Sequence, residues 1–252
     1  MTVYENVKVH FDEGYASVYE EVEILSSGWV RCGTGPFGPM LFPAHRIEDF
    51  AAAVVDLLDA LGIGRIILLG HSMGGMIAQE MAATHPDRVI RLILYGTGPL
   101  GAMPDRFERL ETSRASISRD GMRRTSRRIG ATWFRAGAAA EGHAIVAGLG
   151  AQASEAAALA GLEAMDHWDG RGALDRLTMP TLVLWGDGDR SYRWPQIHML
   201  WQGLPDAQLG VIPGTAHAVH LEKPALFHAL VEDFLIGSPV PDSHAPPSMP
   251  EG

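Results

Sequence analysis

A serine between glycines follows an apolar stretch in the first third of the chain. In "ILLGHSMGG", Gly70 and Gly74 stand two residues before and two residues after Ser72. A serine hydroxyl is a poor nucleophile unless a base removes its proton and a third group orients that base. A nucleophile on a tight strand-to-helix turn leaves no room for side chains at those two flanking positions. The spacing therefore predicts a nucleophilic Ser72, the alternative being a small residue in a glycine-rich loop.

An acid and a base follow later in the chain, each just after an apolar, strand-like stretch. "LVLWGDGDRSY" offers Asp187 and Asp189, and "GVIPGTAHAVHLEKP" offers His217 and His220. The order Ser, Asp, His is the one expected for a nucleophile on an α/β sheet. Such a set would transfer an acyl group from an ester-like substrate, and the residue types alone leave both pairs of candidates open.

Strand-like and helix-like stretches alternate on both sides of Ser72, which predicts the elements that position these groups. A strand, a helix and a strand within about thirty residues form a βαβ unit, and this unit implies a parallel sheet. The turn at Ser72 opens a helix, so the backbone N–H of Met73 can donate to a developing oxyanion. The predicted fold class is α/β, with a mostly parallel, doubly wound sheet. Strands are expected at 65–70, 88–96, 180–186 and 207–214.

Composition divides the chain into four parts. Residues 1–98 and 179–236 carry the alternating pattern and are predicted to form the two parts of one sheet core. Residues 99–178 are rich in alanine and arginine, and we expect them to form a helical cap inserted between those parts. The tail at 237–252 contains five prolines and has almost nothing to bury, so we expect it to be disordered.

The bulk composition excludes several classes of function. The net charge of −10 argues against a nucleic acid or an anionic membrane as the partner. Cys32 is the only cysteine, which favours a reducing compartment. The sequence has no signal-peptide pattern and no stretch long enough to span a membrane, so a cytoplasmic protein is expected. Neither a metal site nor a nucleotide-binding loop is indicated, and no cofactor is expected.

Arginine is concentrated in the helical insertion, where nine arginines fall between residues 106 and 135. A solvated helix face is the simpler interpretation. The other is that some of these arginines face a pocket and attract a carboxylate-bearing substrate. On that hypothesis Arg127 and Arg128, together with Trp133, are the candidate substrate-binding residues.

Three segments together resemble the α/β-hydrolase superfamily: "GHSMGG", "PTLVLWGDGDRSY" and "GTAHAVHLEKPALF". The resemblance covers most of the chain and is closest to small esterases, lactonases such as 3-oxoadipate enol-lactonase, and cofactor-free haloperoxidases. In that family the acid stands three residues after the glycine that ends its strand, which implies Asp189. The base lies in a Gly-x-x-His turn, which implies His217. The resemblance makes Asp187 a loop residue and His220 a structural one.

The N-terminal part departs from the family pattern, because only 71 residues precede Ser72. The His-Gly segment that normally supplies a second oxyanion donor is absent. One alternative is that "ILSSG" is a shortened strand, with a backbone N–H near Ser27 or Gly28 standing in. The other, which we favour, is an internally deleted homologue with incomplete N-terminal strands, an opened site and unpaired strand edges.

The resemblance implies a serine hydrolase that cleaves a small ester or lactone through an acyl-enzyme. Ser72 would attack, His217 would take its proton, Asp189 would fix the histidine tautomer and the Met73 N–H would stabilise the oxyanion. The alternative is a catalytically weak or inactive homologue that binds a small molecule, because fold and triad do not prove turnover. In both cases the expected partner is a small molecule, and a homodimer stays open.

Overall fold

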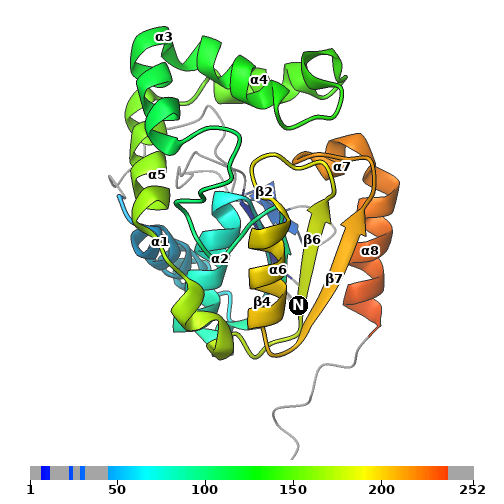
Figure 1. Ribbon diagram of the computed structural model, residues 1–252. Helices are drawn as coiled ribbons and strands as arrows, with labels where there is room; N and C mark the ends of the chain where they lie inside the picture. The colour runs from blue at the N-terminus through cyan, green and yellow to red at the C-terminus, as the bar shows by residue number, and fades with distance from the viewer. Residues whose placement is uncertain (1–6, 12–22, 25–28, 32–44, 238–252) are drawn as a thin grey trace, which may run out of the picture.

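Seven strands form one sheet in the computed structural model, which describes residues 7–11, 23–24, 29–31 and 45–237 (Figure 1). Their order across the sheet is β2-β3-β1-β4-β5-β6-β7, and neighbours are parallel except for the antiparallel pair β2 and β3. The strands are β1 (Val7–Phe11), β2 (Glu23–Ile24), β3 (Trp29–Arg31), β4 (Ile66–His71), β5 (Val89–Tyr95), β6 (Thr181–Gly186) and β7 (Ala207–Ile212). The predicted α/β class with a mostly parallel sheet is confirmed.

Helices cover both faces of this sheet and extend beyond one end of it. The α-helices of the described chain are α1 (Ile47–Ala60), α2 (Met73–Thr84), α3 (Leu110–Ala131), α4 (His143–Gly150), α5 (Glu155–His167), α6 (Trp194–Gly203), α7 (Val219–Glu222) and α8 (Pro224–Ile236). Short 3-10 helices lie at Pro86–Arg88, Gly137–Ala139 and Arg171–Arg176. No single helix of the described ranges is long and apolar enough to cross a membrane, although α4 and α5, bent by 102°, meet that test when taken together.

The central strands are apolar throughout because they are buried on both sides. Every side chain of β4 is buried. Successive side chains of a strand point to opposite faces, so Leu68 joins the core beneath α1, α2 and α6, whereas Leu69 joins the core beneath α8. Figure 1 shows α8 on one side of the sheet, with α6 and α2 on the other.

The segment between β5 and β6 contains most of its residues in helices. It carries α3, α4 and α5, and in the described residues its sole β pairing is an isolated bridge between Leu100 and Asp169. Figure 1 shows α3 and α4 beyond the carboxyl ends of β6 and β7, where they form a cap. The limits of this cap at 99 and 178 stay predictions, and the tail at 238–252 lies outside the described residues.

The expectation of an unpaired edge near the shortened N-terminus is wrong for β4. Val7–Phe11 runs parallel to Ile66–Gly70 along the full length of β1, and β3 pairs with the other edge of β1. Strand β4 is thus bonded on both sides, by β1 and by β5. The segment "ILSSG" lies outside the described residues except for Ile24, so the two alternatives for the second oxyanion donor stay predictions.

Candidate active site

Ser72 occupies a strained turn between β4 and α2. Its φ of 55° and ψ of −120° make it the one non-glycine residue with a positive φ in the described part of the chain. Such a backbone costs about 1–3 kcal/mol and persists where its surroundings fix it. Here the Ser72 N–H donates to the Tyr95 carbonyl oxygen at 3.0 Å, and the Ser72 carbonyl oxygen accepts from Thr97 Oγ1 at 2.7 Å. The turn therefore holds the Ser72 side chain at the carboxyl edge of the sheet.

The lack of space for a Cβ explains two glycines of the motif. A Cβ at Gly70 would overlap the Gly74 carbonyl oxygen, and a Cβ at Gly75 would overlap the side chain of Thr97, which follows β5. Glycine is thus required at 70 for the turn and at 75 for the approach of α2 to the sheet. Met73 is the first residue of α2 and is buried, so its backbone N–H lies at the positive end of the helix dipole.

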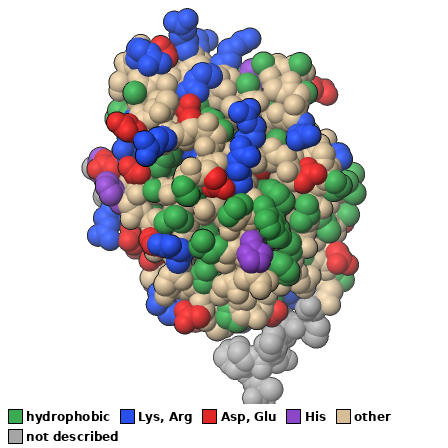
Figure 2. Space-filling model, in the orientation of Figure 1, with side chains coloured by type: hydrophobic (Ala, Val, Ile, Leu, Met, Phe, Trp, Pro, Cys, Tyr) green, Lys and Arg blue, Asp and Glu red, His purple; other side chains and the backbone are tan. Residues whose placement is uncertain are grey.

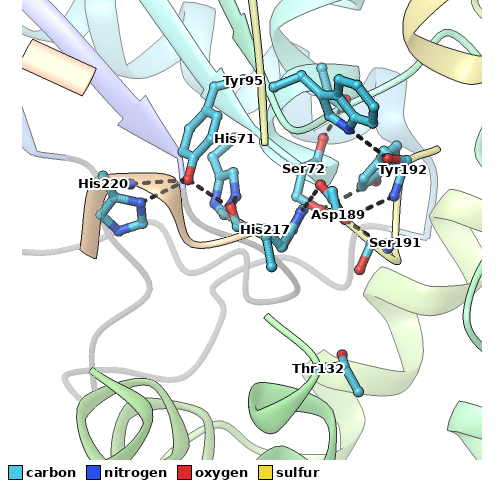
Figure 3. Close-up of polar contacts among 12 residues, drawn as sticks. His71, Ser72, Tyr95, Thr132, Asp189, Ser191, Tyr192, His217 and His220 are labelled. Atoms are coloured by element: carbon cyan, nitrogen blue, oxygen red, sulfur yellow. Dashed lines mark hydrogen bonds and ion pairs between the residues drawn. The ribbon is translucent and has the colours of Figure 1, made fainter. Parts of the chain in front are cut away.

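Asp189 and His217 form a buried pair at the ends of β6 and β7 (Figure 3). His217 Nδ1 lies 2.7 Å from Asp189 Oδ2, and both side chains have an exposed fraction of 0%. The other carboxylate oxygen of Asp189 accepts N–H bonds from Ser191 at 2.7 Å and Tyr192 at 3.1 Å. Asp187 is exposed and accepts instead from the Gly214 N–H at 2.7 Å. The carboxylate that meets the imidazole is therefore that of Asp189.

The backbone of His217 is held by an aromatic cluster that the sequence did not reveal. The Tyr95 hydroxyl donates to the His217 carbonyl oxygen at 2.7 Å, and His71 Nε2 lies 3.2 Å from the same oxygen. His71 stacks on Tyr95, with ring centroids 4.3 Å apart. His220 Nδ1 contacts the Tyr95 hydroxyl at 3.0 Å, so His220 supports the turn rather than the reacting centre. The sequence feature that could have indicated this role of Tyr95 is its position at the end of β5, the strand beside β4.

Tyr192 is a second residue that sequence reasoning missed. It is fully buried, its hydroxyl lies 3.2 Å from Ser72 Oγ, and its ring stacks on that of His217 with centroids 5.6 Å apart. Figure 3 shows it beside Ser72 and Asp189, with Thr132 of the cap across from this group. Its place three residues after Asp189, in "GDGDRSY", was the signal that could have found it.

A cavity of about 80 Å³ lies within the cap, and Trp133, which is part of its wall, also contacts His217. The Trp133 ring is edge-on to His217 at 5.2 Å. The Trp133 carbonyl oxygen also accepts the N–H of Ala218 at 2.9 Å. The lining residues are Arg106, Ile117, Met122, Thr125, Ser126, Ile129, Gly130, Trp133, Val146, Gly150, Ala158, Leu162 and Met165.

Comparison with known proteins identifies the family. Residues 27–230 match the model of the alpha/beta hydrolase family. The chain belongs to this family. The superfamily predicted from the serine turn and the two later loops is thereby confirmed.

Relatives of this α/β hydrolase include a 2-hydroxy-6-oxo-6-phenylhexa-2,4-dienoate hydrolase of Comamonas testosteroni, which is 32% identical over 251 residues. That match covers 92% of this chain and 81% of the relative. An uncharacterized protein of Mycobacterium tuberculosis is 27% identical over 213 residues, which are 76% of this chain and 62% of that protein. An enol-lactonase of Burkholderia xenovorans LB400 shares the fold, with a TM-score of 0.73, 22% identity and coverage of 91% of this chain and 90% of the other.

The cap of this α/β hydrolase does not bring Arg127 and Arg128 to the cavity. Both side chains are exposed, and Arg128 is bound to Glu108 by an ion pair of 2.6 Å. Burial raises the pKa of Glu108, but hydrogen bonds from Arg128 and Ser113 outweigh it and hold that pKa below its usual value. Among the described arginines, Arg106 is the one that lines the cavity.

Proposed function

We propose that this chain is a serine hydrolase that cleaves a small ester or lactone through an acyl-enzyme. The observation that carries the proposal is the fully buried Asp189–His217 pair, 2.7 Å apart, beside a serine on a strained turn. Because a buried carboxylate that binds Nδ1–H leaves the other imidazole nitrogen to act as a base, this arrangement suits proton transfer from Ser72.

The reaction has two halves in this proposal. Ser72 Oγ bonds to the substrate carbonyl carbon while His217 Nε2 takes the serine proton, and the carbonyl π electrons move to oxygen. The Met73 N–H stabilises that oxyanion. The carbon–oxygen bond to the leaving group then breaks, and the leaving oxygen receives the proton from His217. Water, activated by the same imidazole, releases the acyl group from Ser72.

The Comamonas testosteroni relative favours a second candidate reaction. Its name describes an oxo acid rather than an ester as the substrate. In that reaction Ser72 Oγ would bond to the ketone carbon while His217 takes the serine proton. The bond from that carbon to the neighbouring carbon would then break, and the leaving carbon would receive the proton from His217. A cytoplasmic location and a homodimer stay predictions from the sequence.

A substrate panel tests the proposed function. We expect the purified chain to hydrolyse p-nitrophenyl acetate or a small lactone, and to react with a fluorophosphonate probe at Ser72. Turnover of a 6-oxo-dienoate with no ester turnover would favour the second candidate instead. Labelling without turnover of any compound would favour the weak, ligand-binding homologue, and neither labelling nor turnover would end the hydrolase proposal.

A carboxylate-bearing substrate is the finer part of this proposal, and Arg106 is the residue to which we assign the carboxylate. Arg106→Gln is expected to raise KM for p-nitrophenyl hemisuccinate by about 10- to 100-fold, because a hydrogen bond to a charged group contributes about 1.5–3 kcal/mol. KM for the neutral p-nitrophenyl butyrate should stay unchanged. Steady-state kinetics on both esters measure the difference.

Arg127→Gln is the matched control, since Arg127 is exposed and does not line the cavity. This variant should leave both KM values at those of the wild type. An equal rise for the two esters in Arg106→Gln would contradict the assignment, because it would report a disturbed cap rather than a lost charge.

A further inference from the structure

Tyr192 contacts each of the three candidate residues, and it does so through a different part of its structure each time. Its backbone N–H donates to Asp189 Oδ1 at 3.1 Å. Its ring lies nearly parallel to that of His217, at an interplanar angle of 15°. Its hydroxyl lies 3.2 Å from the Oγ of Ser72. The last contact brings a second hydroxyl group to the reacting atom.

The Tyr192 side chain is rigidly held. Its backbone is bound at both ends, because its N–H donates to Asp189 and its carbonyl oxygen accepts Trp185 Nε1–H at 2.8 Å. The side chain has no exposed surface. Phenylalanine would keep the same stacking on His217 without the cost of burying a hydroxyl. The hydroxyl group is thus the feature that packing alone does not explain.

The destination of the serine proton decides the direction of the hydrogen bond between the two hydroxyls. Either hydroxyl can donate or accept. Once Ser72 directs its proton to His217, however, Ser72 Oγ can only accept, and Tyr192 must donate. A hydrogen bond of this kind is roughly twice as strong when its acceptor carries negative charge. The contact therefore strengthens as Ser72 Oγ acquires negative charge on losing its proton.

We propose that the Tyr192 hydroxyl is a catalytic hydrogen-bond donor that stabilises the negative charge developing on Ser72 Oγ as the serine proton moves to His217. This inference rests on the proposed hydrolase function. The Ser72 Oγ–carbon bond forms, the carbonyl electron pair moves to oxygen and the serine proton goes to His217. Tyr192 keeps its own proton and donates to Ser72 Oγ, whereas the Met73 N–H donates to the carbonyl oxygen. Because the donor is already in place, it lowers the barrier without reorganisation during the reaction.

Tyr192→Phe tests this role, because it removes the hydroxyl and leaves the ring and backbone contacts. Loss of one oxyanion donor costs about 10²–10³-fold in kcat in other serine hydrolases, and we expect a loss of that size here with KM nearly unchanged. A boronic acid, which forms a tetrahedral adduct with an active serine, should bind more weakly by the same factor. The rate of fluorophosphonate labelling should fall as well.

Thr181→Val is the matched control. It also removes one buried hydroxyl, which donates to the Met179 carbonyl oxygen at the start of β6, at the opposite end of the strand from Asp189. We expect this variant to keep the kcat, the boronate affinity and the labelling rate of the wild type. Circular dichroism and thermal unfolding of both variants show that each is folded.

Two failures are distinguishable. If the wild type is labelled and turns over substrate, but Tyr192→Phe keeps its kcat, boronate affinity and labelling rate within about twofold, the role of Tyr192 is overturned and the hydrolase function stands. A Tyr192→Phe variant that raises KM with kcat unchanged also overturns it, because such a tyrosine would bind ground state and transition state alike. If the wild type is neither labelled nor active, both proposals fall.

Discussion

Ser72→Ala is expected to lower kcat by about 10⁴–10⁶-fold, because it removes the atom that forms the acyl-enzyme. Alanine also has a Cβ, so the positive φ at this position costs about as much free energy in the variant as in the wild type. The hydrogen bonds that fix the turn use the backbone of Ser72 and survive the change. The variant should therefore unfold at nearly the same temperature as the wild type. Initial rates on p-nitrophenyl acetate and mass spectrometry after fluorophosphonate treatment measure the loss.

Ser118→Ala provides the matched comparison for this experiment. Ser118 is exposed on α3 and lies outside the cluster around His217. Its replacement should leave the rate and the mass increase on labelling as in the wild type. A Ser72→Ala protein that still gains the mass of the probe, or that keeps more than about a hundredth of the activity, would show that another nucleophile acts.

The second large effect concerns Asp189. Asp189→Asn is expected to lower kcat by about 10⁴-fold, since an amide no longer fixes the productive histidine tautomer or stabilises the imidazolium ion. The amide oxygen of asparagine can still accept the N–H bonds of Ser191 and Tyr192, so the loop should keep its shape. Steady-state rates should fall while Ser72 remains slowly labelled, because the nucleophile itself is intact.

Asp187→Asn is the control for this substitution, because it makes the same chemical change two residues away. Asp187 is exposed and braces the Gly214 N–H. Activity should stay within a few-fold of the wild type, as asparagine can accept the same bond. Equal losses in the two variants would mean that loop geometry, rather than the charge beside His217, is what the reaction needs.

Much of the candidate site could be predicted because parallel strands end at a common edge. Strands β4, β6 and β7 carry Ser72, Asp189 and His217 on the turns that follow them, with β5 between the first two. A sequence reveals such strand ends through apolar runs that stop at glycine, as at Gly70 and Gly186. The alternation of side chains between the two cores follows from the same strands.

The cap could not be predicted to the same depth. Helix α3 contains a non-helical residue, Gly121, with φ of 76° and ψ of 167°. A break of this kind shifts the helical phase, so spacing along the sequence no longer tells which side chains share a face. Arg127 and Arg128 follow this break and are exposed, whereas Arg106 lines the cavity from the loop that precedes α3. The role of Tyr192 could not be predicted for another reason, since an aromatic residue after an apolar strand is typical of core packing.

The hydrogen bond from the Ala218 N–H to the Trp133 carbonyl oxygen joins the cap to the residue that follows His217. A displacement of the Trp133 backbone would break that bond and remove one support of the turn that holds His217. The position of this part of the cap and the position of the His217 turn are thereby coupled through one backbone hydrogen bond.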